Sequence, residues 1–333
     1  MDSIIIEGIA FSIPLFIIAI GGIYSEGSGV INLALEGLLG FGAFAGGLSY
    51  ALLSSVITGN PLLLIYASLA FAMVGGALLA SLHALMCIKF KANQVISGVV
   101  INMLSVALTA FLANQINASV FGQPSNKFLL EIFPKVTVPL LSRIPILGAV
   151  FTDLYTFIPI IVAVAILMAY IYYKTPFGMH IRACGDNPHA VAAAGGNVMK
   201  IRFVSVLVSG ALAGLGGMCF AYSISTTFSP NIYMGFGYLA IAAYIFGSWK
   251  ISRTFLACIL FGFARSAGYV LVQKLELPSS FGDLVLTLPY IVTLVLLLFF
   301  SSKTKAPRAL GDVYELLHRE PRGSLCYVSI LKA

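Results

Sequence analysis

The chain has 333 residues, of which 59% are hydrophobic and only 9% are charged. A soluble domain would carry roughly a quarter charged residues, so this composition excludes an ordinary soluble protein. Apolar runs of about 20 residues, the length that crosses a bilayer as a helix, recur along the whole chain. The sequence therefore predicts an all-α polytopic integral membrane protein, and not a barrel, whose strands alternate over about 10 residues.

The chain begins with MDSIIIEG, which carries Asp2 and Glu7 where a cleavable signal peptide would have a positive region. The first apolar run is therefore expected to remain as a membrane span. We expect about eight to ten transmembrane helices, some of them short or broken. The predicted spans are 4–23, 30–55, 61–88, 95–117, 153–173, 203–222, 235–248, 255–273 and 284–300.

Basic residues cluster in four segments that follow predicted spans. They are Lys89 and Lys91; Lys174, Arg182, Lys200 and Arg202; Lys250 and Arg253; and Lys303, Lys305 and Arg308. The span count places all four segments on one face, which the positive-inside rule makes cytoplasmic. The same rule accounts for the net charge of +7, so no nucleic-acid partner is expected.

These assignments predict one membrane domain and one tail. Residues 1–303 form the transmembrane domain, with a proline-containing extracytoplasmic loop at 118–152 and a cytoplasmic loop at 174–202. Residues 304–333 form a cytoplasmic C-terminal tail. The N-terminus is expected outside if 24–55 crosses once, but its many glycines also permit a kinked or re-entrant path.

The sequence RACGDNPHAVAAAGGNV in the 174–202 loop carries the signals of a short helix. Asn187 is a good N-cap, and Pro188 suits the first helical position, where its missing N–H costs nothing. Gly195 supplies a left-handed stop. A helix of about two turns is too short to be stable alone in water, so it is expected to pack against something.

Few residues suit catalysis or metal binding. Ser28 and His83 are the best pair for a serine dyad, but a packing serine and a hydrogen-bonded histidine are far more common. The sequence has no HExxH motif and no G-x-x-x-x-G-K-[ST] loop for nucleotide phosphates. The chain is therefore not expected to be an enzyme or to hold a metal or cofactor, and its five scattered cysteines are expected to be buried and inert.

Two groups of polar residues lie inside or beside predicted spans, where polar side chains cost free energy and face protein or water. The first group consists of Glu26, Asn32 and Glu36. The second consists of Asn93, Gln94, Ser97 and Asn102. These residues could hold helices together or line a solute pathway, and the sequence leaves both interpretations open.

Several stretches resemble the permease subunits of bacterial ABC importers. They are YSEGSGVINLALEGLLGFGAF, KANQVISGVVINML, the loop sequence with the helix that follows it, GFGYLAIAAYIFGSWK, and APRALGDVYE. The resemblance is to the branch that serves simple sugars, nucleosides and related solutes such as riboflavin, within the wider group of ribose and branched-chain amino-acid permeases. The sequence departs from this branch at Gly27, where a basic residue is common, and at SWKISR, which lacks the usual Pro and Gly.

This resemblance implies a type II ABC importer-like permease that moves a small polar solute by alternating access. In such importers a short cytoplasmic helix docks into a cleft on the ATPase subunit. The residues that match this loop are Arg182, Gly185, Asn187, Pro188, Ala192 and Gly195. The implied partners are an ATPase that binds the ATP, a second permease subunit, an extracytoplasmic binding protein or lipoprotein, and the lipid of the bacterial cytoplasmic (inner) membrane.

Two alternatives remain. A stand-alone secondary transporter or channel would need an ion-coupling residue near the midplane, and Glu36 is the best carboxylate for that role. The loop helix could also lie on lipid headgroups, but such helices carry bulky apolar residues, whereas this one has alanines and Val191. The sequence predicts neither which solute is carried nor whether the second permease subunit is identical.

Overall fold

The computed structural model describes residues 2–57, 59–130, 135–137, 154–233, 235–276, 287–288, 290–291, 295 and 306–315. Seven of its helices are long and apolar enough to cross a membrane. They are α1 (Asp2–Gly27), α2 (Leu35–Leu53), α3 (Pro61–Ala84), α4 (Gln94–Val120), α5 (Phe157–Lys174), α8 (Val198–Phe220) and α10 (Ile251–Lys274). The prediction of an all-α polytopic membrane protein is confirmed.

Shorter elements connect these helices. The short helices are α6 (Pro176–Asp186), α7 (Pro188–Ala193), α9 (Phe236–Phe246) and the 3-10 turn η4 (Pro230–Ile232). Two π-helical turns, η1 (Leu85–Lys89) and η3 (Ala221–Ser225), extend α3 and α8. The strands form two antiparallel pairs, β1 (Phe128–Leu129) with β4 (Thr227–Phe228) and β2 (Lys135–Val136) with β3 (Leu154–Tyr155).

Two predicted spans differ from the structure, and a third lies mostly outside the described residues. The span 30–55 begins too early, because residues 28–34 are irregular and α2 starts at Leu35. The span 235–248 corresponds to α9, whose 11 residues are too few to cross a bilayer. The span 284–300 lies mostly outside the described residues, as do most of the predicted tail and much of the predicted 118–152 loop.

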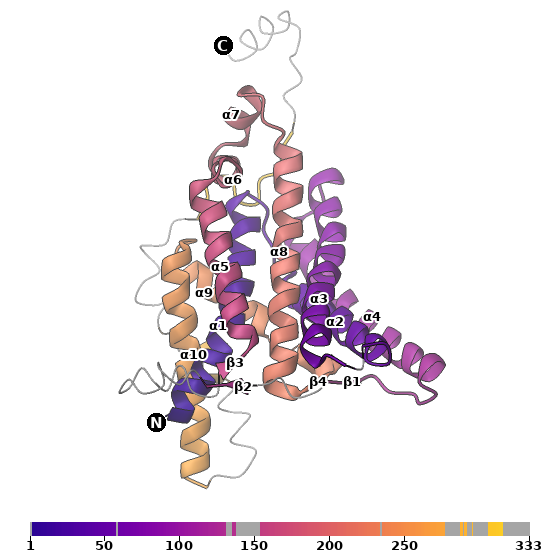
Figure 1. Ribbon diagram of the computed structural model, residues 1–333. Helices are drawn as coiled ribbons and strands as arrows, with labels where there is room; N and C mark the ends of the chain where they lie inside the picture. Colours follow the sequence, from indigo (N-terminus) through magenta and orange to yellow (C-terminus); the bar gives the residue numbers. More distant parts are fainter. Residues whose placement is uncertain are drawn as a thin grey trace, which may run out of the picture.

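Helix α8 lies in the middle of the bundle and packs against α1, α2 and α3 (Figure 1). Glycines allow this close approach, since a Cβ on Gly214 would overlap the carbonyl oxygen of Ala72. A Cβ on Gly76 would likewise overlap the carbonyl oxygen of Gly210. Membrane helices gain packing contact when small residues line their interfaces, so the glycines of α2 and α8 serve close packing.

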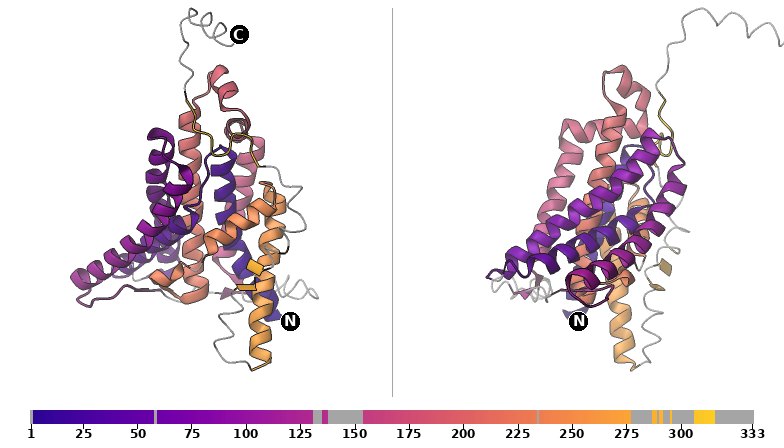
Figure 2. Two further views of the ribbon diagram at one scale, coloured as in Figure 1. Left: turned by 180° about the vertical axis from the view of Figure 1, so that it is seen from behind. Right: turned by 90° about the vertical axis from the view of Figure 1, so that its right-hand side faces the viewer.

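The functional segments lie at two opposite ends of the bundle (Figures 1 and 2). The N-terminus of α1 and the short strands lie at one end, which we call the strand end. Helices α6 and α7 and residues 306–315 lie at the other, which we call the α7 end. Ion pairs of Lys91 with Glu315 and of Arg308 with Asp186 join three of the predicted basic segments there. The remaining basic segment, with Lys250 and Arg253, lies beside the end of α5, because the N–H of Ile251 donates to the Tyr173 hydroxyl.

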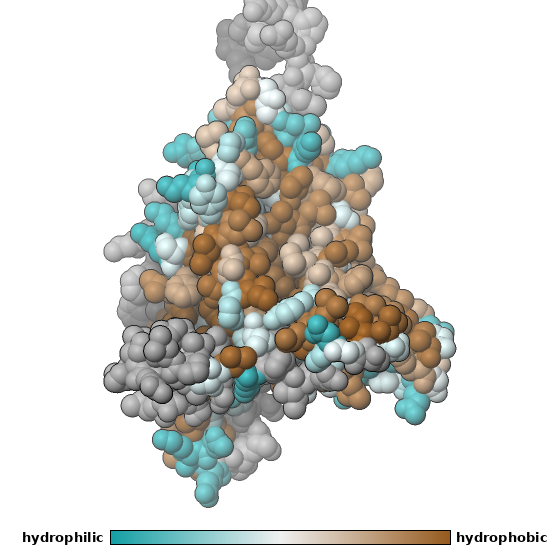
Figure 3. Space-filling model, in the orientation of Figure 1, coloured by the Kyte–Doolittle hydropathy of each residue, from teal (hydrophilic) through white to brown (hydrophobic). Residues whose placement is uncertain are grey.

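The outside of the bundle is apolar between these ends. Large apolar side chains such as Leu78 on α3, Met103 on α4, Ile166 on α5 and Leu256 on α10 are exposed. In the face shown in Figure 3, hydrophobic residues fill the middle of the bundle and hydrophilic ones gather toward both ends. A soluble protein rarely exposes apolar patches of this extent, whereas lipid contact accounts for them.

Candidate coupling surface and polar core

Helix α7 has the ends that its sequence predicts. The side-chain oxygen of Asn187 accepts the N–H of Ala190 at 3.0 Å, and Pro188 occupies the first turn. Gly195 has a φ of +86°, which favours glycine, and the N–H of Gly196 donates to the Val191 carbonyl at 2.9 Å. The start and the end of α7 are therefore both fixed by neighbouring residues.

One side of α7 packs against its own loop. Val191 is buried in a small apolar cluster with Cys184 and Val198. Ala192 is half-buried against the same cluster. Burial raises the pKa of the Cys184 thiol to about 11, so this cysteine is protonated and unreactive at neutral pH, as predicted.

The other side of α7 is exposed and consists of small side chains. Ala190, Ala193 and Ala194 are exposed there, beside His189, whose ring lies 5.4 Å from that of Tyr314. Ala192 was predicted to be one of the docking residues, and in the structure it is turned partly inward while Ala193 is exposed. The coupling surface, which we define as Ala190, Ala193 and Ala194, is a small, flat protein face.

Residues 306–315 are bound to the helix before α7. The carbonyl of Gly185 accepts the N–H of Ala309 at 2.8 Å. A Cβ at Gly185 would overlap the carbonyl oxygen of Gly27 and would lie 3.3 Å from the Cβ of Pro307. Gly185 is therefore required by close approach of three chain segments, a role that the loop motif alone did not reveal.

Arg202 connects the same segments from the first turns of α8. Its side chain is buried, and its Nε donates to the Ser28 carbonyl at 3.1 Å. Its Nη1 donates to the Asp312 carbonyl at 2.7 Å, and nearby the N–H of Gly311 donates to the Gly29 carbonyl. The sequence analysis counted Arg202 only as a cytoplasmic charge. The only feature of the sequence that indicated a buried role for Arg202 was its position next to an apolar run.

Arg182 braces α6 against α5. Its guanidinium donates to the Tyr172 carbonyl and lies 5.5 Å and 5.8 Å from the ring centres of Tyr172 and Tyr173. This predicted loop residue therefore sets the angle between the two helices, and its side chain points into the protein.

Two residues of the second predicted polar group, Gln94 and Asn102, contact the backbone of the segment that carries the first group, where residues 28–34 run along α4. Gln94 accepts the N–H of Ile31 at 2.7 Å. Asn102 accepts the N–H of Gly37 at 2.7 Å, and its amide donates to the Leu33 carbonyl at 2.8 Å and to the Tyr238 hydroxyl at 2.9 Å. These contacts satisfy backbone groups that the irregular segment leaves without helical partners.

Glu36 holds the start of α9. One carboxylate oxygen accepts the N–H of Gly235 at 2.8 Å and the other accepts the N–H of Gly237 at 2.6 Å. The first N–H groups of a helix have no partner within the helix, and they carry a partial positive charge that a carboxylate stabilises. Glu36 is thus the N-terminal cap of a half-length helix that lies beside α1, α2 and α10.

The remaining predicted polar residues lie apart from this contact. Glu26 accepts from the Tyr244 hydroxyl and from Trp249 Nε1, both at 2.7 Å. Asn32 donates to the Ser209 hydroxyl at 2.9 Å, and the exposed Asn93 caps the start of α4. Each side chain therefore has a structural hydrogen-bonding role in the described part of the chain.

The structure does not assemble the serine dyad that the sequence analysis weighed. The Ser28 hydroxyl donates to the Ser25 carbonyl at 2.7 Å. The His83 ring contacts the Ser97 hydroxyl at 2.9 Å and the Ile31 carbonyl at 3.2 Å instead. Within the described residues, no group of His, Cys, Asp and Glu side chains is placed to hold a metal ion.

Comparisons with known proteins agree with this architecture. The family model for the branched-chain amino acid transport system / permease component matches residues 4–300. The guanosine ABC transporter permease protein NupQ of Bacillus subtilis is 37% identical over 92% of this chain and 94% of its own. The nucleoside ABC transporter permease protein NupC of Lactococcus lactis is 37% identical over 94% of this chain and 97% of its own.

A further relative, the guanosine ABC transporter permease protein NupP of Bacillus subtilis, is 25% identical over 78% of this chain and 72% of its own. No solved structure matches the chain significantly. The relatives are permease proteins, so ATP hydrolysis belongs to a separate subunit, in agreement with the prediction that this chain is not an enzyme. The chain belongs to the branched-chain amino acid transport system permease family and is a membrane-spanning permease subunit of an ABC importer.

Proposed function

We propose that this chain carries nucleosides across the membrane in an importer driven by ATP bound to a separate ATPase subunit. Two relatives that are 37% identical over most of the chain are named as guanosine and nucleoside ABC transporter permease proteins. The main structural support for ATP-driven transport is the coupling surface, because it is an exposed face of small side chains at the basic end of the bundle. Such a face fits a protein cleft better than a lipid surface.

The α7 end is proposed to face the cytoplasm of a bacterial inner membrane. All four predicted basic segments gather there, and positive residues favour the cytoplasmic side. The strand end and the N-terminus then face outward, and residues 306–315 are cytoplasmic. The ATPase would dock at the α7 end and an extracytoplasmic binding protein or lipoprotein at the strand end.

Movement of α7 would reach the membrane through a continuous set of contacts. The contact of Gly185 with Ala309 would transmit the movement of α7 to residues 306–315. The hydrogen bonds of Arg202 would transmit it from there to residues 28–34. That segment leads directly into Glu36, which holds the start of α9. In this mechanism, closure of the ATPase shifts α9 relative to its neighbours and opens the pathway toward the other side.

We infer that the predicted polar residues stabilise the wall of the pathway and do not contact the solute. Asn102 and Gln94 join residues 28–34 to α4, and Glu36 joins α2 to α9. All three side chains are buried, and their hydrogen-bonding atoms are engaged by the protein itself. A solute would have to displace these contacts to reach them.

The second permease subunit is proposed to be a different chain. NupQ and NupP occur in the same organism, and both are named as guanosine permease proteins, although this chain is 37% identical to one and 25% identical to the other. A pair of unlike permeases explains why one organism has two such proteins for one solute.

Energy-dependent uptake in membrane vesicles separates this proposal from a secondary transporter. A secondary transporter needs a carboxylate that is free to bind a coupling ion, whereas both oxygens of Glu36 accept backbone N–H groups. Vesicles holding the complete importer should take up labelled guanosine with ATP and its binding protein, and not with an ion gradient alone. Uptake driven by a proton or sodium gradient without ATP would contradict the proposal.

A further inference from the structure

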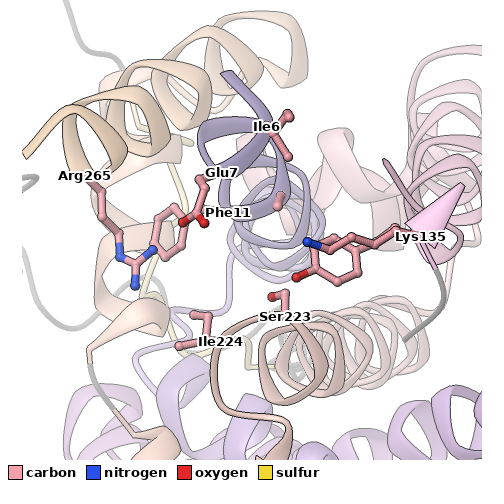
Figure 4. A pocket seen from close by; sticks show the side chains of 9 residues that line it. Ile6, Glu7, Phe11, Lys135, Ser223, Ile224 and Arg265 are labelled. Atoms are coloured by element: carbon pink, nitrogen blue, oxygen red, sulfur yellow. The ribbon is translucent and has the colours of Figure 1, made fainter. Parts of the chain in front are cut away.

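A polar cavity of about 720 Å³ opens at the strand end, between α1, η3 and α10. Its lining includes Glu7, Ser223, Arg265, Ser266, Tyr269 and Gln273. A smaller recess that shares Glu7, Ser223 and Arg265 extends it toward Phe11 (Figure 4). This volume lies within the range of about 300–1,000 Å³ that is usual for sites of small organic ligands.

Arg265 is a cation in the middle of an apolar helix. Its guanidinium carbon lies 4.5 Å from the centre of the Phe11 ring and 4.9 Å from that of Tyr269. Its side chain interacts with Tyr269 and Glu7, but among the described residues its Nε has no acceptor within hydrogen-bonding distance and no carboxylate lies within ion-pair distance. Charged residues inside membrane proteins are costly, and they usually mark the path of a solute or ion.

Two further polar groups are left without partners beside Arg265. The hydroxyls of Ser223 and Ser266 are buried and have no hydrogen-bond partner in the described part of the chain. An arginine that only reached for the membrane surface would point away from the bundle. Figure 4 instead shows its side chain beside the Phe11 ring, close to Glu7. Unused donors and acceptors around one cavity indicate a polar ligand.

The smaller recess reaches the ring of Phe11, which packs against two further buried rings. The rings of Phe11, Phe220 and Phe236 lie 4.7 Å to 5.2 Å apart from centre to centre. Phe236 is the first residue of α9, the helix whose start Glu36 holds. A ligand in the cavity would therefore lie close to Phe11, whose ring contacts the first residue of the helix that the ATPase is proposed to move.

We propose that this cavity is the entry site of the permease, where a nucleoside base binds after it leaves the binding protein. This inference rests on the proposed nucleoside function. The base is flat and stacks on the ring of Tyr269, which lines the cavity. Arg265 donates to base acceptors, since guanidinium groups pair with O6 and N7 of purines, and Glu7 accepts from a ring N–H. The exposed side chain of Gln273 binds the ribose.

The test follows protection of a thiol in the reconstituted complex of both permeases and the ATPase, without the binding protein, so that the strand end stays open. Gln273→Cys places a thiol at an exposed position of the cavity lining, and a small membrane-impermeant methanethiosulfonate modifies it. The probe ligand is inosine, which offers O6, N7 and an N1–H. Inosine should slow the modification, and glucose should not.

Arg265→Gln in the same background should raise the inosine concentration that gives half protection by about tenfold or more, the effect expected for one bidentate arginine contact. Lys274→Gln is the matched control, because Lys274 is on the same helix but does not line the cavity. Equal protection in the parent and in Arg265→Gln would overturn the inference.

Two further results keep the inference separate from the proposed function. If Arg265→Gln does not assemble, Glu7→Gln replaces it in the test, because Glu7 is exposed. Unchanged protection by inosine in Glu7→Gln would then overturn the inference. If the complete wild-type importer takes up nucleosides but inosine never protects the thiol of Gln273→Cys, the entry site is wrong while the function stands. If the wild-type importer takes up no nucleoside, the proposed function itself fails.

Discussion

Helices α7 and α9 are both too short to cross a membrane, yet they are held in opposite ways. Helix α7 takes its cap from Asn187 and its stop from Gly195, which directly adjoin it in sequence. Helix α9 instead begins at the carboxylate of Glu36, a residue of a different helix. A helix held by its own loop can move with that loop, whereas α9 cannot shift without changing its contact with α2.

The groups that cap the starts of α7 and α9 also differ in their surroundings. The cap of α7 is exposed, where a capping hydrogen bond contributes about 1 kcal/mol. The cap of α9 is a buried charged group with two backbone partners, and charge-assisted hydrogen bonds are roughly twice as strong as neutral ones. Damage to α9 should therefore unfold the permease, whereas damage to α7 should spare the fold and weaken the ATPase contact.

Glu36→Ala is expected to have the largest effect. It leaves two N–H groups of α9 unpaired inside the bundle, at about 1–3 kcal/mol each. The yield of assembled complex and the Tm of the detergent-purified permease should both fall. Glu315→Ala is the matched control, since Glu315 forms only an exposed ion pair and such pairs contribute little. An unchanged Tm in Glu36→Ala would contradict the claim that the cap of α9 stabilises the fold more than the cap of α7 does.

Arg202→Met tests the proposed connection between α7 and α9. The methionine keeps much of the apolar stem but removes the hydrogen bonds to the Ser28 and Asp312 carbonyls, each about 1.5–3 kcal/mol for a charged donor. The ATPase should still bind through α7, but less solute should cross per ATP hydrolysed. Lys200→Met, at an exposed position in the same part of α8, should leave this ratio unchanged. Equal ratios in Arg202→Met and wild type would contradict the proposed route.

Asn187→Ala is expected to have the smallest effect. Loss of the α7 cap costs about 1 kcal/mol, which corresponds to about fivefold weaker association with the ATPase. Asn197→Ala is the control, because Asn197 makes the same kind of cap for the long helix α8. The Kd for the ATPase, measured on purified subunits, should rise only in Asn187→Ala. A drop in Tm as large as that of Glu36→Ala would show that α7 is part of the core.

The sequence predicted α7 well because helix caps are local. Asn187, Pro188 and Gly195 lie within or next to the helix that they define, so their order alone indicates its start and stop. The basic segments were also predictable, because their common side follows from counting spans. Both features need no knowledge of how the helices pack.

The cap of α9 could not be predicted, because its partners lie far apart in sequence. Glu36 and Gly235 meet only after α2 and α9 pack together. Helices that are apolar on all sides give no periodic signal for the face that turns inward. The same limit explains why the buried role of Arg202 was not predicted.

Recovery of the ATPase by Ala193→Trp permease tests the central claim, that α7 is the coupling helix, most directly. The side chain of Ala193 is exposed on the coupling surface, so the variant should insert and assemble normally. A tryptophan would overfill the cleft at a cost of about 1–3 kcal/mol. Val56→Trp, exposed at the strand end, is the control.

The account predicts that Ala193→Trp permease recovers less ATPase and transports less, while Val56→Trp permease matches the wild type. A helix lying on lipid headgroups would tolerate the tryptophan or bind the membrane more tightly. Wild-type recovery of the ATPase together with normal uptake in Ala193→Trp would contradict the coupling role of α7.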